Sequence, residues 1–333
     1  MWRDGAVISR RACFVGWLSA LATCSSIARA SSQRFTVGVL FGGEPTGPSL
    51  SEWLEFVAEL RRLGYLEGTN ITFIKRVGDI YRPDLLQRLA GELVAARVDL
   101  IYTAGGTPAA AAAKRATHTI PIVFNSSGDP VGLKLVNSLD RPGGNMTGSA
   151  IQNDAVFVKG LEFFAHTVPE LVRIVCIQPA GIRNLSWFHS EQAAAEAGAR
   201  KLRIDFSYAD VRSVAEVEPL LASYTKQRVG VVVEDHPEFS DRLENIAATC
   251  LGFNVPAMGD ARRGFLLHYR MDQRQLGRKA ANYVDKILRG TKPSALPVEQ
   301  VSSFELVVNQ KVAAKLGIRI PPSILARTDE LLQ

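Results

Sequence analysis

The chain has 333 residues, of which 47% are hydrophobic, 22% charged and 8% aromatic. This length is typical of about two domains, and the composition excludes collagen-like, coiled-coil and disordered chains. Half of the formal net charge of +6 lies within residues 1–30, and the other Lys and Arg residues are mixed with Asp and Glu. We therefore expect no nucleic-acid partner, which would require a basic stripe.

Residues 1–30 have the features of an export signal. Arg10 and Arg11 precede an apolar run over 12–22, and Ala28-Arg29-Ala30 fits a small-residue cleavage site. The run is too short to cross a bilayer, which needs about 20 residues. The arginine pair resembles a twin-arginine signal. We predict cleavage before Ser31 and a soluble periplasmic protein.

A lipid anchor is not expected. Cys24 is the one cysteine at a position where lipidation could occur, but Thr23 stands before it, where a smaller residue is wanted. Beyond the signal only Cys176 and Cys250 remain. The sequence does not show whether these two cysteines lie close together in the fold. Buried free thiols and a disulfide therefore both remain open.

From Phe35 onward, strand patterns alternate with helix patterns. We predict strands at 35–41, 70–76, 98–102, 121–124, 173–178, 202–208, 229–234, 255–258, 264–269 and 304–308. We predict helices at 49–63, 83–96, 108–116, 155–167, 186–199, 211–227, 239–251 and 272–288, followed by a terminal helix. This order predicts an α/β fold with parallel sheets covered on both faces by helices.

The densest cluster of turn residues, 140–148, divides this alternation into two lobes of similar size. Two parallel sheets offer a crevice at the carboxyl ends of their strands. A boundary that bends would allow the two lobes to close around a ligand.

Catalytic and metal-binding motifs are absent from the sequence. It contains no hydrolase nucleophile elbow, P-loop, zinc-protease motif or dinucleotide fingerprint. The histidines have no metal-ligand spacing and are expected at the surface or at caps; they are His118, His166, His189, His236 and His268. We predict no catalytic residue, no metal and no cofactor.

The segment 102–110 is the most informative local feature. A buried strand ends at Tyr102, two glycines follow, and Thr107 and Pro108 have the order of an N-cap and a first helical residue. The amino end of such a helix binds anions such as a carboxylate. The alternative is an ordinary capped helix without a ligand.

Other polar residues follow strands at the same predicted edges. Asp129 and Asp235 could also be simple cap or turn residues. As a set, these residues supply the few convergent polar groups that a ligand site needs. The predicted ligand-binding residues are Gly43, Glu44, Thr103, Gly105, Gly106, Thr107, Asn125, Asp129, Asn153, Gln178, Asp235, His236 and Asp260.

Several segments resemble the solute-binding proteins of ABC importers, in particular the group that binds tryptophan and other amino acids. They are Gly64-Tyr-Leu-Glu-Gly-Thr-Asn70, Gly105-Gly-Thr-Pro-Ala-Ala110, Arg141-Pro-Gly-Gly-Asn-Met-Thr-Gly148, Tyr283-Val-Asp-Lys-Ile-Leu-Arg-Gly290 and Leu296-Pro-Val-Glu-Gln300. The family often has Gly-Gly-Leu-Met-Ser-Tyr-Gly where this chain has Gly264-Phe-Leu-Leu-His-Tyr-Arg270, and an Asp at the position of His236.

The resemblance implies a two-lobed type I periplasmic-binding fold with three crossovers at the hinge. The crossovers are expected near 148–153, near Tyr269 and around Pro297. Lobe one would contain 31–150 and 270–297, and lobe two would contain 151–269 and 298–333.

The resemblance also implies a function. The protein would be a monomer that captures a small solute, an amino acid or a similar carboxylate, between its lobes and delivers it to an ABC permease. The alternatives are a ligand-sensing receptor for a membrane sensor and, less favoured, a two-lobed α/β enzyme.

Overall fold

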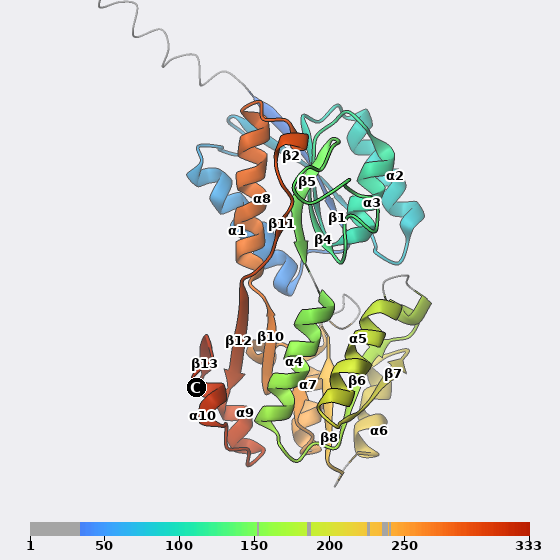
Figure 1. Cartoon of the computed structure of the whole chain (residues 1–333), viewed down its shortest axis with the longest axis vertical. Coiled ribbons are helices and arrows are strands. Elements are labelled where there is room, and N and C mark those ends of the chain that lie inside the picture. The colour runs from blue at the N-terminus through green and yellow to red at the C-terminus, as the bar shows by residue number, and fades with distance from the viewer. Residues whose placement is uncertain (1–33, 152, 185–187, 225–226, 235–238, 240) are drawn as a thin grey trace, which may run out of the picture.

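The chain forms two α/β lobes stacked along its longest axis (Figure 1). The computed structural model describes residues 34–151, 153–184, 188–224, 227–234, 239 and 241–333. The predicted signal, Cys24 and Ser31 lie outside these residues. In the described part, no helix combines the length and the hydropathy needed to cross a membrane.

The first lobe contains a sheet whose neighbouring strands are all parallel. Its spatial order is β11 (Glu299–Gln300), β5 (Met146–Ile151), β4 (Ile122–Ser127), β3 (Leu100–Ala104), β1 (Phe35–Phe41) and β2 (Ile71–Val77). Helices α1 (Gly47–Arg62) and α8 (Gln273–Leu288) pack on one face, and α2 (Pro83–Ala95) and α3 (Thr107–Ala116) on the other.

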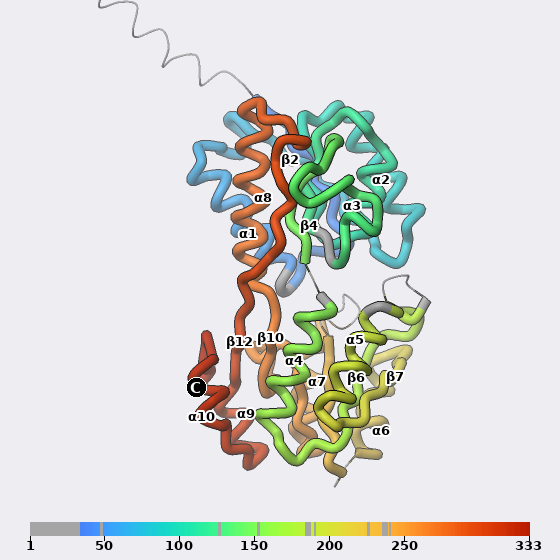
Figure 2. Tube along the Cα trace, viewed as in Figure 1, coloured from blue at the N-terminus to red at the C-terminus, as the bar shows by residue number. Residues whose placement is uncertain are grey.

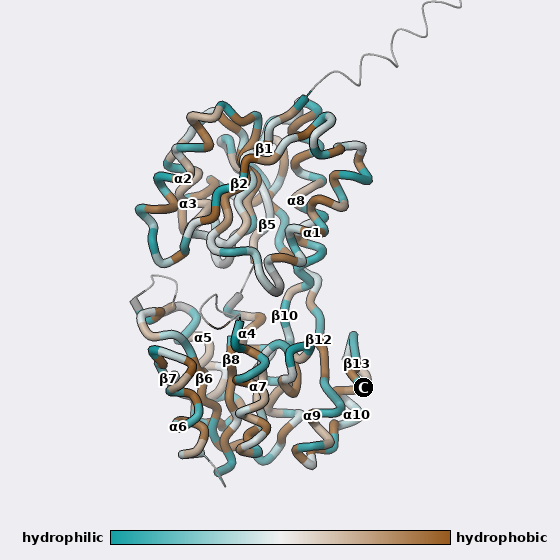
Figure 3. Tube along the Cα trace, turned by 180° about the vertical axis from the view of Figure 1, so that it is seen from behind, coloured by the Kyte–Doolittle hydropathy of each residue, from teal (hydrophilic) through white to brown (hydrophobic). Residues whose placement is uncertain are grey.

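Both faces of this sheet are apolar, because alternate side chains of β1 and β3 enter different cores. Val39 and Leu100 lie in the core under α1 and α8, whereas Leu40 and Ile101 lie in the core under α2 and α3. This arrangement explains the continuous apolar strands of the sequence. Figure 3 shows hydrophobic residues concentrated in the strands and hydrophilic residues on the outer turns of the helices.

The second lobe contains a larger sheet. Its spatial order is β13 (Glu330–Leu332), β12 (Phe304–Asn309), β10 (Leu267–Met271), β9 (Ala257–Met258), β8 (Val229–Val233), β6 (Arg173–Pro179) and β7 (Asp205–Val211). All its neighbours are parallel except β10 and β12, which are antiparallel. The predicted parallel sheet is thus confirmed for the second lobe, with this pair as its antiparallel exception.

Helices cover both faces of the second sheet as well. One face carries α4 (Asn153–Thr167), α5 (Phe188–Lys201), α9 (Gln310–Lys315) and α10 (Pro322–Leu325). The other face carries α6 (Val217–Ala222) and α7 (Leu243–Gly252).

The chain passes between the lobes three times, as can be followed in Figure 2. It leaves β5 for α4, returns from β10 to α8, and leaves β11 for β12. The third crossing follows Gln300 rather than Pro297, because Glu299 and Gln300 still pair with β5. A small apolar cluster holds the crossing segments together; its members are Ile151, Met271, Leu276, Val301 and Phe304.

This connectivity fixes which edge of each sheet faces the other lobe. The carboxyl end of β5 leads into the second lobe, and the carboxyl end of β10 leads into the first. Because β1 to β5 are parallel, and β6 to β10 are parallel, the carboxyl ends of both strand sets face each other across the hinge. Ligands of open parallel sheets bind at this edge.

Two predicted elements differ from the structure. The turn cluster 140–148 contains the start of β5, because Gly148 allows β5 to approach β4: a Cβ atom on Gly148 would lie 1.9 Å from the carbonyl oxygen of Phe124. The predicted helix 211–227 is instead the end of β7, a short 3-10 turn (Val214–Glu216) and α6.

Candidate functional site

Two glycines bring the ends of β1 and β3 into direct contact at the edge that faces the second lobe. Gly105 has φ +117°, and a Cβ atom on it would lie 2.3 Å from the amide nitrogen of Gly42. The Gly42 amide donates a hydrogen bond of 2.8 Å to the carbonyl of Ala104. Gly43 is half-buried and Glu44 is exposed directly beyond this contact.

Helix α3 begins one residue earlier than predicted. Gly106 is its N-cap, Thr107 its first residue and Pro108 its second. The prediction that Thr107 is the N-cap is therefore wrong, because the Gly106 carbonyl already accepts a hydrogen bond from Ala110. Gly106 has φ 81° and ψ −168°, a conformation almost restricted to glycine. The predicted glycine turn and proline-marked start are both present at the edge facing lobe two.

A buried polar cluster lies between α1 and the sheet, on the face opposite to α3. The Asn125 side-chain nitrogen donates to Glu52 at 2.7 Å and to the Tyr102 hydroxyl at 3.1 Å, and Tyr102 donates to the same Glu52 oxygen. Burial raises the pKa of Glu52, and the hydrogen bonds from Tyr102 and Asn125 oppose that shift in part.

Three buried side-chain oxygens on the strands of the first sheet have no hydrogen-bond partner among the described residues: Thr103 Oγ1 in β3, Asn125 Oδ1 in β4 and Ser149 Oγ in β5. Thr103 and Asn125 are predicted site residues, whereas the sequence analysis missed Glu52 and Ser149. The period of α1 gave a signal for Glu52, since it lies four residues before the apolar Phe56 and therefore on the same, buried face of the helix.

Asp129 is a turn residue in this structure. It is exposed, and its carboxylate accepts a hydrogen bond of 2.9 Å from the amide of Val131. Asn153 is the first residue of α4, directly after the first crossing between the lobes.

In the second lobe, the structure separates the predicted residues. Gln178 is buried near the end of β6 and donates to Asp210 at 2.6 Å, and Asp210 pairs with Arg183 at 2.6 Å. Asp235 and His236 lie outside the described residues. Asp260 caps the turn η4 (Ala261–Arg263) by accepting from the Arg262 amide at 3.1 Å.

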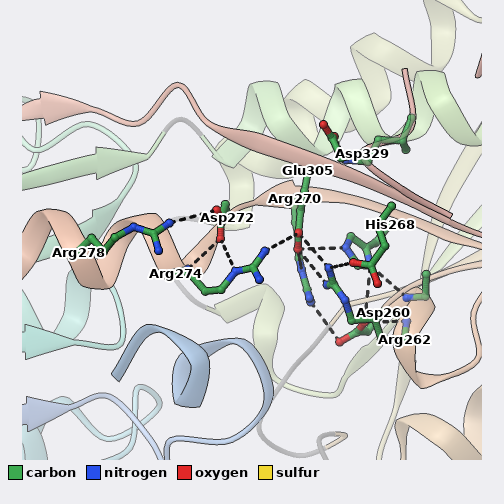
Figure 4. A network of polar contacts seen from close by, with 12 residues as sticks. Asp260, Arg262, His268, Arg270, Asp272, Arg274, Arg278, Glu305 and Asp329 are labelled. Atoms are coloured by element: carbon green, nitrogen blue, oxygen red, sulfur yellow. Dashed lines mark hydrogen bonds and ion pairs between the residues drawn. The ribbon is translucent and has the colours of Figure 1, made fainter. Parts of the chain in front are cut away.

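Asp260 also belongs to an ion network on the hinge strands (Figure 4). Its carboxylate pairs with Arg270 at 3.2 Å. Glu305 of β12 accepts both terminal nitrogens of Arg262 at 3.0 Å, and it pairs with Arg270 at 3.2 Å. Arg274, on α8 of the first lobe, lies 3.8 Å from Glu305 of the second lobe.

His268 is buried in the same network rather than exposed at the surface, and of the two predicted roles it has the capping one, at the first amide of η4. Its Nδ1 accepts from the Ala261 amide at 3.1 Å, and its Nε2 lies 3.4 Å from Glu305. Burial lowers the pKa of His268 and outweighs the hydrogen bond to Glu305, which raises it. Both His268 and Arg270 lie in the segment 264–270, where this sequence differs from the one that the family often has. These two side chains therefore form part of the network.

A further acidic set, which the sequence analysis missed, lies at the carboxyl ends of the second sheet. Glu191 is in the first turn of α5, Asp154 in the first turn of α4, and Glu234 directly after β8. Glu191 is only 5% exposed. Burial, followed by the charges of Glu234 and Asp154, raises the pKa of Glu191 to about 9.

Cys176 and Cys250 are both free and buried, which decides between the two alternatives for this pair. Among the residues that the structure describes, no group of three or more His, Cys, Asp or Glu side chains is arranged to hold a metal ion.

The model of the family "ABC transporter substrate binding protein" matches residues 47–332. The chain belongs to this family. Its members bind a solute for an ABC transporter and act outside the cytoplasm, and the family is one of binding proteins rather than of catalysts.

Individual relatives have the same architecture. A tyrosine-binding protein of Clostridioides difficile is 26% identical over 271 residues, covering 79% of this chain and 76% of the relative. A conserved domain protein of Vibrio cholerae is 26% identical with a TM-score of 0.75, covering 90% of this chain and all of that structure. An ABC domain of Streptococcus pneumoniae in complex with L-Trp is 24% identical with a TM-score of 0.74, with the same coverage.

Proposed function

We propose that this protein captures an amino acid, or a similar small carboxylate, between its two lobes and delivers it to an ABC permease. The observation that carries this proposal is the start of α3, where Gly105 and Gly106 place a helix amino end at the edge facing lobe two. The first amide groups of a helix lack partners within the helix and attract anions.

The choice of solute class is supported from outside the chain as well. The relative from C. difficile is a tyrosine-binding protein, and the structure from S. pneumoniae contains L-Trp. We extend this class to the present protein because the strand edges that would contact such a solute include Thr103 and Asn125, whose buried side-chain oxygens have no hydrogen-bond partner among the described residues.

We further propose that the mature protein begins at Ser31 and works as a monomer in the periplasm. The basic pair, the short apolar run and the Ala28-Arg29-Ala30 site support export. Amino-terminal sequencing of periplasmic material should return Ser31 as the first residue; a retained Met1 would contradict the localisation.

The proposed capture requires the lobes to move. A ligand shifts the equilibrium between open and closed lobes only by its difference in affinity for the two states, so the solute must contact both lobes when they are closed. Small-angle scattering of the mature protein with saturating L-tyrosine or L-tryptophan should give a smaller radius of gyration than without it. Unchanged scattering, together with proven binding, would contradict capture by hinge closure.

A further inference from the structure

Two of the three crossings between the lobes run side by side and are tied to each other. The second crossing joins β10 to α8, and the third joins β11 to β12. Met271 and Phe304 pair at the ends of β10 and β12, and directly beyond them the Asp272 amide donates a hydrogen bond of 3.2 Å to the Ser303 carbonyl. Any rotation of one lobe against the other must bend these segments, because they connect the lobes covalently.

An arginine just beyond this tie lies between carboxylates of different lobes. Arg274 is in the first turn of α8, and its Nε is 3.2 Å from Asp272, the N-cap of the same helix. Its Nη2 is 3.8 Å from Glu305 Oε2 in β12 of the second lobe. Figure 4 shows both contacts. A lobe rotation therefore changes the separation of Arg274 and Glu305, whereas Arg274 and Asp272 move together.

Both charges of this pair keep a partner when the lobes move apart. Glu305 is also held by Arg262 at 3.0 Å and by Arg270 at 3.2 Å, and both arginines belong to the second lobe. Arg274 keeps Asp272. Separation thus leaves no unpaired charge behind, which is the large cost of breaking a buried ion pair. The contact between Arg274 and Glu305 is therefore a reversible link between the lobes rather than a lock.

Each end of the link is fastened to its own lobe by a further ion pair. On the first-lobe side, Arg278 of α8 pairs with Glu55 of α1 at 3.0 Å. On the second-lobe side, Arg262, which holds Glu305, also pairs with Glu330 of β13 at 2.5 Å. The two ends therefore move with their lobes as a whole, and the link responds to the angle between the lobes.

The link is open to the solvent at one end. The Arg274 side chain is 56% exposed, whereas that of Glu305 is 13% exposed. Dissolved salt screens exposed charges more strongly than buried ones. The attraction between the two side chains should therefore weaken as the ionic strength rises.

We propose that the pair of Arg274 and Glu305 is a salt-sensitive link that favours the arrangement of the lobes seen in this structure. Ionic strength outside the cytoplasm would then shift the equilibrium between lobe arrangements, and with it the affinity for any solute that prefers one of them. This inference rests on the lobe movement in the proposed function, but not on the identity of the solute.

Distances between two spin labels, measured by double electron–electron resonance, test the link without any solute. The labels replace Asp84 and Arg212, two exposed residues that follow β2 and β7, the edge strands far from the crossings. Cys176 and Cys250 are buried and stay unlabelled in the folded protein. Raising NaCl from about 20 mM to about 500 mM should lower, at least twofold, the ratio of the population with the distance of this structure to all others.

Matched variants on the same helix separate the link from a general effect of charge. Arg274→Gln at low salt should lower this population ratio at least twofold and remove the further response to salt, whereas Arg274→Lys should keep a response. Arg289→Gln is the control, because Arg289 is 65% exposed and pairs with Asp285 inside the first lobe at 2.6 Å. It should behave as the wild type. Both Gln variants should melt close to the wild type, since exposed ion pairs contribute little to stability.

The outcomes distinguish this inference from the proposed function. If Arg274→Gln and Arg289→Gln give the same distance distribution, or if Arg274→Gln keeps the full response to salt, the link is wrong while lobe movement stands. A single distance that neither salt nor saturating L-tryptophan or L-tyrosine changes would contradict lobe movement itself, and this inference would fail with it.

Discussion

Gly42 and Gly105 are in backbone contact where β1 and β3 end, and neither can acquire a side chain in place. A Cβ atom on Gly42 would lie 2.5 Å from the carbonyl oxygen of Gly105, and one on Gly105 would lie 2.3 Å from the amide nitrogen of Gly42. The site at the start of α3 is thus held by the sheet itself rather than by a loop.

This contact makes Gly105→Ala destabilising. The overlap with Gly42 and the φ of +117° together should lower the free energy of unfolding by about 2–5 kcal/mol. Gly91→Ala is the control, because Gly91 lies in α2 with open space around it. It should stabilise the protein by about 0.5–1 kcal/mol. Urea denaturation measures both, and equal effects would contradict the close contact.

Gly106→Val should reduce solute affinity at least tenfold, about 1.4 kcal/mol, because it adds a branched side chain at the proposed anion site. Its φ of 81° and ψ of −168° add a cost of about 1–3 kcal/mol in stability. Titration calorimetry below the melting transition separates the two effects. Normal affinity in the folded variant would place the anion site elsewhere.

Stability should depend on pH through Glu191. The unfolded chain gives up this proton near pH 4.5, whereas the folded protein holds it up to a pKa of about 9. The wild type therefore loses stability relative to Glu191→Gln as the pH rises from 4.5 to 9. At pH 8 the variant should be more stable by at least about 1 kcal/mol. Urea titrations at pH 5 and pH 8 measure this, and a constant difference would refute it.

The hinge network should respond to acid in the opposite sense. Burial alone would raise the pKa of Glu305, but hydrogen bonds from His268 and Arg262 outweigh it and hold that pKa well below the usual range. The stabilisation from Glu305 is present above pH 4.5 and is lost as the pH falls below it. Glu305→Gln should cost about 1–3 kcal/mol at pH 7, because it leaves Arg262 and Arg270 without their shared carboxylate.

Glu244→Gln is the matched control for Glu305→Gln. Glu244 is 72% exposed and lies 3.8 Å from Arg263, so its loss should change stability by less than about 0.5 kcal/mol. Denaturation at pH 7 and at pH 3 should show the Glu305 variant converging toward the wild type in acid. A Glu305 variant with neutral stability at pH 7 would contradict the network.

The alternation of strands and helices could be predicted from the sequence, because the spacing of apolar residues that indicates each element lies within that element. The glycine turn before α3 could also be predicted, because it is indicated by adjacent residues. The raised pKa of Glu191 was not predicted, because it depends on burial and on carboxylates of two other chain segments, and nothing in its own helix indicates this. The burial of His268 was not predicted, since it depends on Glu305, which is 37 residues away and reaches His268 through the antiparallel pairing of β10 and β12.

β5 shows the remaining limit of local patterns. Gly148 is of a residue type that is typical of turns. In this fold, its lack of a side chain instead lets β5 lie against the Phe124 carbonyl in β4. Close approach of two strands and a turn require the same residue type, so only the fold distinguishes them.

Native mass spectrometry of the mature protein, purified without denaturation, tests the central claim most directly. If the protein captures an amino acid between its lobes, the spectrum should show one retained solute in a one-to-one complex, which on release carries both an amine and a carboxylate. The same preparation of Gly106→Val should contain much less of it. A retained sugar, or a solute without a carboxylate that both proteins hold equally, would contradict the account.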